Sequence, residues 1–249
     1  MRQKPMRSAL PEVERRKIVH LAHQTIKEEE AKDVINYLMS DARNFSPDEI
    51  NTIIDKYKIG YVPSRVKNRF GDKHEFAGRI ILPIYDQHNR LIALSSRDWR
   101  PDSNMKFFHE SFDKSLYLYG LNIAKQNIIK QKMAIVVEGE FDVQKLYVKG
   151  FTFTVGVMGS ALQLAQIALL SRYCREIFLI FDGDEAGSAA ADRIIKMSLQ
   201  RQFYVDFLDI IPVVMPKNID PDIFLDKYGQ DGFIKLLKQS REIYKERFE

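Results

Sequence analysis

The chain has 249 residues, of which 45% are hydrophobic and 29% are charged, and its formal net charge is +4. Such a composition is ordinary for a globular protein of one large or two modest domains, and the charge permits nucleic-acid binding without requiring it. The single cysteine, Cys174, excludes an internal disulfide and a cysteine-rich zinc site. No apolar run approaches the length of about 18 residues that spans a membrane, and the N-terminus lacks the apolar segment of a secretory signal, so we expect a cytoplasmic protein with no membrane partner.

The first part of the chain predicts helices followed by a hairpin. Residues 11–40 carry apolar side chains at helix spacing, and Ser46-Pro47-Asp48-Glu49 has the form of a capping box that starts a second helix. Residues 56–79 form a basic, loop-rich stretch. Residues 79–86 and 91–97 are typical of two strands joined by a tight turn.

From residue 133 the pattern alternates between strand and helix. The expected strands are residues 133–137, 151–157, 177–181 and 204–211, and the expected helices are residues 140–149, 160–172 and 185–199. This alternation predicts a mostly parallel sheet with right-handed crossovers. The tail from Asp222 onward indicates two short helices that are interrupted at residues 229–232.

Acidic residues follow three of the expected sheet elements. They are Glu138 after the first strand, Asp182 and Asp184 after the third, and Asp220 and Asp222 after the last. Ligands of open α/β sheets bind at the carboxyl edge, where these side chains would meet. Two carboxylates 4 Å apart repel by about 4 kcal/mol at an effective dielectric of 20, and a divalent cation would turn that repulsion into attraction. Oxygen ligands of this kind suit Mg²⁺ or Mn²⁺ rather than zinc, although each acid alone could also be a helix cap beside a solvated turn.

Short motifs occur in both halves of the chain. In the second half they are Glu138-Gly-Glu-Phe-Asp142, Gly159-Ser160, Asp182-Gly-Asp184-x-Ala-Gly187 and Asp220-Pro-Asp222. In the first half they are Tyr57-Lys-Ile-Gly60, Arg79-Ile-Ile-Leu-Pro-Ile84, Ile92–Arg97, Met105-Lys-Phe-Phe108, and Lys114 with Leu118-Tyr-Gly120. With these motifs the chain resembles the catalytic core of bacterial and phage DnaG-type DNA primases, the motifs of the second half resembling the family's Toprim domain and those of the first half its N-terminal subdomain. The chain departs from the family in having Ser160 for threonine and Ser95-Ser96 for two glycines.

The resemblance implies a fold of three parts. We expect a mixed α/β N-terminal subdomain in residues 1–125, with basic residues that bind nucleic acid. A Rossmann-like Toprim domain with a mostly parallel sheet would follow in residues 126–215, and a short helical segment in residues 216–249. The family's zinc-binding and helicase-binding modules have no counterpart in this sequence, so we expect no zinc in this chain.

The resemblance also implies RNA primer synthesis on single-stranded DNA from ribonucleoside triphosphates, a nucleotidyltransferase reaction that uses Mg²⁺ or Mn²⁺. The implied catalytic residues are Glu138, Asp182 and Asp184, and these would share metal binding with Asp220 and Asp222. For Glu138, a general-base role and a metal-positioning role both stay open.

The implied nucleic-acid or nucleotide-binding residues are Arg43, Lys67, Arg69, Arg79, Arg97, Lys106 and Lys114. Acids are interspersed with the bases of residues 97–114, so a solvated loop of mixed charge is the alternative there. A replicative helicase or a separate zinc-binding protein would be a further partner.

The sequence is also compatible with two other functions. A Toprim-type nuclease or topoisomerase-like enzyme would break DNA strands with the same acids, although no segment is typical of a topoisomerase's separate tyrosine domain. A non-catalytic accessory protein would bind single-stranded DNA and use its acids only structurally.

Overall fold

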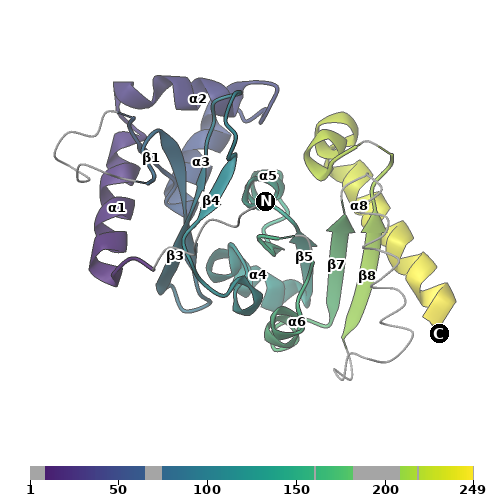
Figure 1. Ribbon diagram of the computed structural model, residues 1–249. Helices are drawn as coiled ribbons and strands as arrows, with labels where there is room; N and C mark the ends of the chain where they lie inside the picture. Colours follow the sequence, from purple (N-terminus) through teal and green to yellow (C-terminus); the bar gives the residue numbers. More distant parts are fainter. Residues whose placement is uncertain (1–8, 65–74, 160, 182–207, 218, 249) are drawn as a thin grey trace. The chain divides into compact units, whose positions relative to one another are not determined.

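A computed structural model describes residues 9–64, 75–159, 161–181, 208–217 and 219–248 (Figure 1). The predicted helix at residues 185–199 lies outside these ranges. The chain divides into two compact units, residues 1–113 and residues 114–249. The expected boundaries after residues 125 and 215 remain predictions. No helix in the ranges above is long and apolar enough to cross a membrane.

Helices form the start of the first unit. They are α1 (Glu12–Thr25), the 3-10 helix η1 (Glu29–Ala31), α2 (Lys32–Met39) and α3 (Pro47–Tyr57). The predicted helical stretch 11–40 is therefore interrupted, because Glu28 is extended, with φ −96° and ψ 163°. The predicted capping box is confirmed: the Oγ of Ser46 accepts from the backbone N–H of Glu49 at 3.3 Å, and Oε2 of Glu49 accepts from the N–H of Ser46 at 2.9 Å.

The first unit also contains an antiparallel sheet. Its strands are β1 (Gly60–Val62), β2 (Arg79–Tyr85), β3 (Leu91–Arg97) and β4 (Phe107–His109), in that order. The predicted hairpin is confirmed as β2 and β3, and Asn89 in the turn between them has a positive φ of 62°. Helix α1 packs on one face of this sheet through a core that includes Ile18, Ala22 and Leu94. Gly60 permits the close approach, because a Cβ there would lie 2.5 Å from the Cβ of Ala22.

The second unit is built around a parallel sheet (Figure 1). Its strands are β5 (Met133–Val137), β6 (Thr154–Gly156), β7 (Glu176–Phe181) and β8 (Asp209–Val214), and their order is β6-β5-β7-β8. All three pairings are parallel, as predicted. The prediction for the last strand was displaced: β8 starts five residues later than residue 204 and continues beyond Ile211 through Pro212. Pro212 is tolerated because β8 is at the end of the described strand order, where a missing N–H need not break a ladder.

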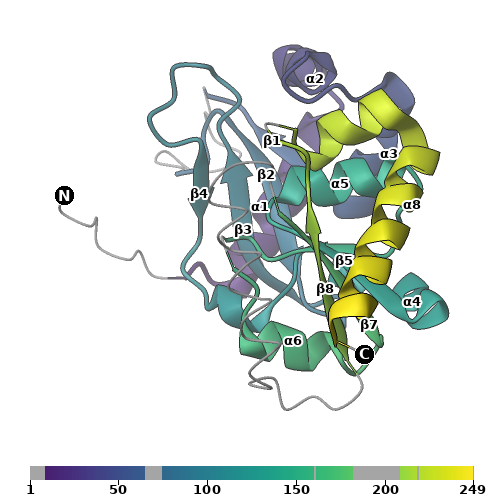
Figure 2. The ribbon, with the colours of Figure 1, turned by 90° about the vertical axis from the view of Figure 1, so that its right-hand side faces the viewer.

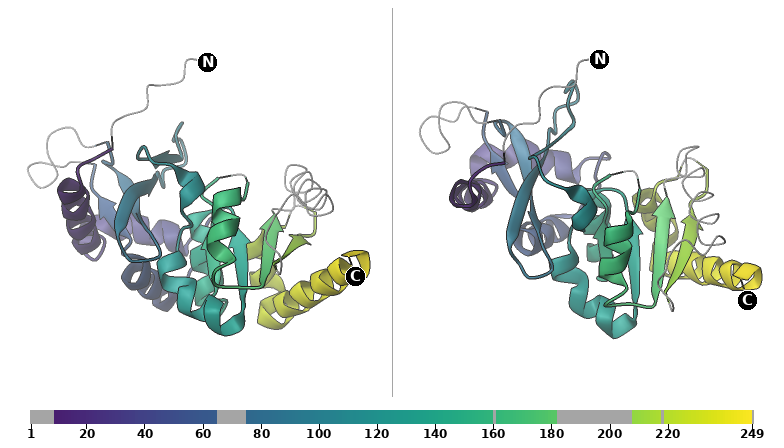
Figure 3. Two further views of the ribbon diagram at one scale, coloured as in Figure 1. Left: turned by 90° about the horizontal axis from the view of Figure 1, so that it is seen from below. Right: turned by 60° about the horizontal axis from the view of Figure 1, so that its bottom comes forward.

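Helices cover both faces of the parallel sheet. They are the 3-10 helix η2 (Lys114–Leu116), α4 (Leu121–Gln131), α5 (Glu140–Val148), α6 (Leu164–Leu170) and α8 (Pro221–Phe248). One core is formed by α4 and α6 with the strands, and includes Ile128, Ile167 and Leu179. Figure 3 shows α6 and α8 on opposite sides of the sheet, and Figure 2 shows α8 running alongside β8. The predicted interruption of the tail is confirmed at Gly229, whose φ of 66° and ψ of −175° are not helical.

Candidate active site

The carboxyl ends of β5, β7 and β8 lie at the same edge of the parallel sheet. Val136 is paired with Leu179, and Phe181 is paired with Val214, so the three strands end within about one residue of each other in register. Glu138 leaves this edge directly after β5 and is half-buried. The register of these strands therefore brings the chain segments that follow β5, β7 and β8 to one edge of the sheet, as the predicted acidic site requires.

The other four predicted acids follow β7 and β8 in the sequence. Asp182 and Asp184 follow β7 in the sequence and lie outside the described residues. Asp220 is exposed, and Asp222 is half-buried in the first turn of α8. In the part of the chain that the structure describes, no group of three or more His, Cys, Asp or Glu side chains could hold a metal ion. Glu138, Asp220 and Asp222 thus form no metal site by themselves, although a donor set made only of carboxylates has the right chemistry for Mg²⁺ or Mn²⁺.

Backbone hydrogen bonds join the loops that follow β5 and β6. The N–H of Val157 donates to the carbonyl oxygen of Val137, and the N–H of Met158 donates to that of Glu138, both at 3.0 Å. Met158 has a positive φ of 57°, which is uncommon for a residue with a side chain. These two hydrogen bonds hold residues 157 and 158, which lead into the Gly159-Ser160 motif, against the loop that carries Glu138. Ser160 itself lies outside the described residues.

Lys114 stabilises the same turn from a different element. Its ammonium Nζ donates to the carbonyl oxygen of Met158 at 3.1 Å. Burial lowers the pKa of Lys114, and the nearby carboxylate of Glu140 partly opposes that shift. The buried Gln166 holds residues 114–117 in place, because its amide donates to the carbonyl oxygens of Lys114 at 3.1 Å and Tyr117 at 2.7 Å. No local motif indicated Gln166, because its hydrogen-bond partners lie 52 and 49 residues away along the chain.

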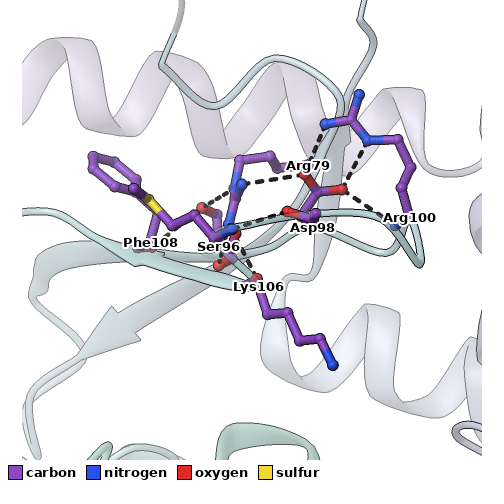
Figure 4. Close-up of polar contacts among 8 residues, drawn as sticks. Arg79, Ser96, Asp98, Arg100, Lys106 and Phe108 are labelled. Carbon is purple, nitrogen blue, oxygen red and sulfur yellow. Dashed lines mark hydrogen bonds and ion pairs between the residues drawn. The ribbon is translucent and has the colours of Figure 1, made fainter.

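Arg79 is the most enclosed of the described basic residues that we expected to bind nucleic acid (Figure 4). It is only 7% exposed, and its Nε donates to the Oγ of Ser96 at 2.9 Å. One terminal nitrogen donates to the carbonyl oxygens of Met105 at 2.9 Å and Lys106 at 3.1 Å. The other lies 3.5 Å from a carboxylate oxygen of Asp98. These contacts give Arg79 a structural role in joining β2, β3 and the segment before β4, and its predicted contact with nucleic acid remains a prediction.

Asp98 completes this cluster. Its side chain is 5% exposed and accepts from the guanidinium of Arg100 at 2.7 and 2.8 Å. Burial alone would raise the pKa of Asp98, but hydrogen bonds from Arg100 and Ser103 outweigh it and hold the pKa at about 2. A second buried acid in this segment, Glu110, pairs with Arg15 of α1 at 2.9 Å. The alternative of a solvated loop of mixed charge is therefore wrong for Asp98 and Glu110.

The remaining basic residues are more accessible. The guanidinium carbon of Arg97 lies 4.7 Å from the ring centroid of Phe107, and its Nε has no acceptor in the described ranges. Lys106 is exposed, and the Nε of Arg43 donates to the hydroxyl of Tyr37 at 2.9 Å. Lys67 and Arg69 lie outside the described residues.

Two family models match the chain, one in each half. The model of the Toprim domain matches residues 132–209, which include β5, β6 and β7. The model of the N-terminal domain of the DNA primase catalytic core matches residues 67–125, which include β2, β3 and β4.

Relatives of known function and solved structures agree with these matches. The DNA primase of Chlamydia pneumoniae is 32% identical over 86% of this chain, and that of Aquifex aeolicus is 31% identical over 68%. The chain spans 38% and 34% of the lengths of these two relatives. A solved DnaG catalytic core is 25% identical, with a TM-score of 0.79 over 92% of this chain and 79% of that one. A DnaG primase catalytic domain bound to single-stranded DNA is also 25% identical, with a TM-score of 0.76 over 92% of this chain and 80% of that one.

The fold and the two family models together define a Toprim protein whose parallel sheet is preceded by an antiparallel, primase-type N-terminal unit. This combination distinguishes it from Toprim proteins at large. The chain belongs to the family of DnaG-type DNA primase catalytic cores.

Proposed function

We propose that this chain synthesises RNA primers on a single-stranded DNA template from ribonucleoside triphosphates. The observation that carries the proposal is the common edge of β5, β7 and β8, at which Glu138 leaves the sheet directly and Asp182 follows in the sequence. A DnaG primase catalytic domain of similar fold binds single-stranded DNA, which supports the template class. The protein would act in the cytoplasm as a DNA-directed nucleotidyltransferase.

The reaction joins two nucleotides by attack of a 3′-hydroxyl on the α-phosphate of a triphosphate, which breaks the bond between the α- and β-phosphates and releases pyrophosphate. Negative charge develops on phosphate oxygens in the transition state, so alignment and electrostatic stabilisation provide most of the catalysis. A bound Mg²⁺ or Mn²⁺ would supply the charge that screens the triphosphate. We assign its binding to Glu138, Asp182, Asp184, Asp220 and Asp222, and catalysis to the first three.

The chain's own contacts would orient this edge. Lys114 and the amide of Met158 hold the Gly159 loop beside Glu138, so the carboxylate has a fixed backbone from which to act. Glu138 could then accept the proton of the attacking hydroxyl or position the cation. We assign nucleic-acid or nucleotide binding to Arg43, Lys67, Arg69, Arg79, Arg97, Lys106 and Lys114. A replicative helicase or a separate zinc-binding protein would act in trans.

Incorporation of labelled ribonucleotides on single-stranded DNA of varied sequence tests the proposal, with Mg²⁺ or Mn²⁺ present. The wild type should synthesise primers, and Asp182→Asn should lose activity by about 100-fold or more, since it removes charge from the site. Asp231→Asn changes an exposed acid on α8 and is the matched control. Unchanged circular dichroism would show that both variants fold. Full activity of Asp182→Asn would refute the assignment.

The same preparation separates the two alternatives. Labelled single-stranded DNA with Mg²⁺ and no nucleotides should remain intact if the chain is a primase, whereas cleavage would favour a Toprim nuclease. DNA binding that needs no metal, with no incorporation under any condition, would favour the accessory protein.

A further inference from the structure

The second unit has a pocket at the amino-terminal end of its parallel sheet, opposite the candidate active site. The cavity has a volume of about 270 Å³. Its lining consists of Met133, residues 149–151, Phe153, Phe178, and five residues of α8, namely Gln230, Ile234, Leu237, Lys238 and Arg241. Met133 begins β5 and Glu138 follows its end, so the length of that strand, about 15 Å, separates the pocket's edge from the acids. The pocket therefore cannot be part of the nucleotidyl-transfer site.

Aromatic rings form the interior of the pocket. Phe151 and Phe153 are in edge-to-face contact, with centroids 6.3 Å apart. Phe178 is 1% exposed on β7, and the guanidinium carbon of Arg241 lies 5.1 Å from its ring centroid. At the mouth, Ile234 is 41% exposed. An apolar ring that entered the pocket would exchange contact with water for contact with these side chains.

The polar lining carries an excess of positive charge. Lys149, Lys238 and Arg241 line the pocket, and no lining residue is acidic. Arg241 pairs with Glu176 at 2.7 Å, and Lys149 lies 3.9 Å from a carboxylate oxygen of Asp226.

Two donors in this lining have no protein partner among the described residues. Lys238 is exposed and has no ion pair among the residues described. The Nε of Arg241 is buried and has no hydrogen-bond acceptor within the same ranges. A buried donor without an acceptor is rare in native proteins, so the hydrogen-bonding capacity of this guanidinium is not used up by its pairing with Glu176.

We propose that this pocket binds a small organic anion in which a flat aromatic ring carries an acidic group. The ring would lie against the partly buried Phe153 and the exposed Ile234, and the acidic oxygens would face Lys238 and the guanidinium of Arg241. Arginine favours this pairing because its planar group can contact an aromatic ring and an oxyanion at the same time. The proposal is independent of primer synthesis, since no residue of the pocket belongs to the candidate active site.

Titration of the whole chain with 1-anilinonaphthalene-8-sulfonate, followed by fluorescence, tests the proposal. This probe combines fused aromatic rings with a sulfonate. It should bind one saturable site, and Ile234→Glu should weaken binding about tenfold or more by placing a negative charge at the mouth. Ile243→Glu alters an isoleucine that is 51% exposed on the same helix outside the pocket, and it should leave the affinity within about twofold. Equal weakening by both variants, or no saturable binding, would overturn the proposal.

A second comparison isolates the contribution of charge. N-phenyl-1-naphthylamine has the same rings without the sulfonate, and it should bind at least about tenfold more weakly. Lys238→Gln should weaken binding of the sulfonate about threefold or more, whereas Lys235→Gln, an exposed lysine on the same helix outside the lining, should have no effect. If the uncharged amine binds as tightly as the sulfonate, the pocket does not select anions and the proposal is wrong. Circular dichroism of each variant establishes that the fold is retained.

Discussion

The backbone N–H of Met158 donates to the carbonyl oxygen of Glu138 at 3.0 Å, and this hydrogen bond joins the loops that follow β6 and β5. The carbonyl oxygen of Met158 in turn accepts from Lys114 at 3.1 Å. One turn with a positive φ thus links a lysine from before the Toprim sheet to the glutamate at the sheet's carboxyl edge. Lys114 can therefore affect activity through this turn, in addition to the nucleotide contact that we propose for it.

Lys114→Met should destabilise the protein, because it leaves the carbonyl oxygen of Met158 without its donor. The expected loss is about 1–3 kcal/mol in the free energy of unfolding, measured by urea denaturation. Lys130→Met, a change at an exposed lysine on α4, should have little effect and is the control. If Lys114→Met reduces primer synthesis without any loss of stability, Lys114 acts only on the nucleotide and the positioning role is wrong.

Asp98→Asn should destabilise the first unit, because Arg79 would lose the carboxylate that compensates its buried charge. The expected cost at pH 7 is about 3 kcal/mol. The neighbouring Asp102 is exposed, so Asp102→Asn should cost less than about 0.5 kcal/mol.

The effect of Asp98 should also depend on pH. Its pKa in the folded protein is about 2, below the ordinary value of 3.8. The folded state therefore favours the ionised carboxylate, which contributes stability above about pH 4, and that contribution is lost as the pH falls towards 2. The wild type should lose about 2 kcal/mol over this range relative to Asp98→Asn, as measured by urea unfolding at several pH values. A difference between the two proteins that does not change with pH would contradict this account.

Arg97→Ala should weaken the binding of single-stranded DNA by about tenfold at low salt if its guanidinium contacts phosphate. The difference from the wild type should shrink as salt rises, because fewer counterions are released by the variant. Fluorescence anisotropy with a labelled oligonucleotide measures both. Arg16→Ala removes an exposed arginine on α1 and should change the affinity little. An unchanged affinity of Arg97→Ala at low salt would exclude Arg97 from the binding surface.

Gly229→Ala should destabilise the second unit by about 1–3 kcal/mol, because φ 66° with ψ −175° is accessible almost only to glycine. Asp231→Ala alters an exposed residue in the same helix and should change stability by less than about 0.5 kcal/mol. Thermal or urea unfolding distinguishes the two. Equal stability of Gly229→Ala and the wild type would show that the break in α8 has no backbone cause.

The parallel sheet was predictable because its strands are short apolar runs, each followed by a turn and, in three cases, by acids. The end of β8 was harder to predict, because Pro212 normally ends a strand and only its place in the strand order makes it acceptable. The buried pairs of Asp98 and Glu110 could not be predicted from local sequence. Their burial depends on Arg79 and on Arg15, which are 19 and 95 residues away.

Primer synthesis by this chain would depend most on the carboxylates at the edge of the parallel sheet acting together on a divalent cation. Titration of the chain with Mn²⁺, followed by electron paramagnetic resonance of the free ion, measures this directly. The wild type should bind Mn²⁺, and the combined variant Glu138→Gln, Asp182→Asn should lose about tenfold or more in affinity, whereas Glu242→Gln with Asp231→Asn should bind as the wild type does. Equal Mn²⁺ affinity in all three proteins would contradict the central claim.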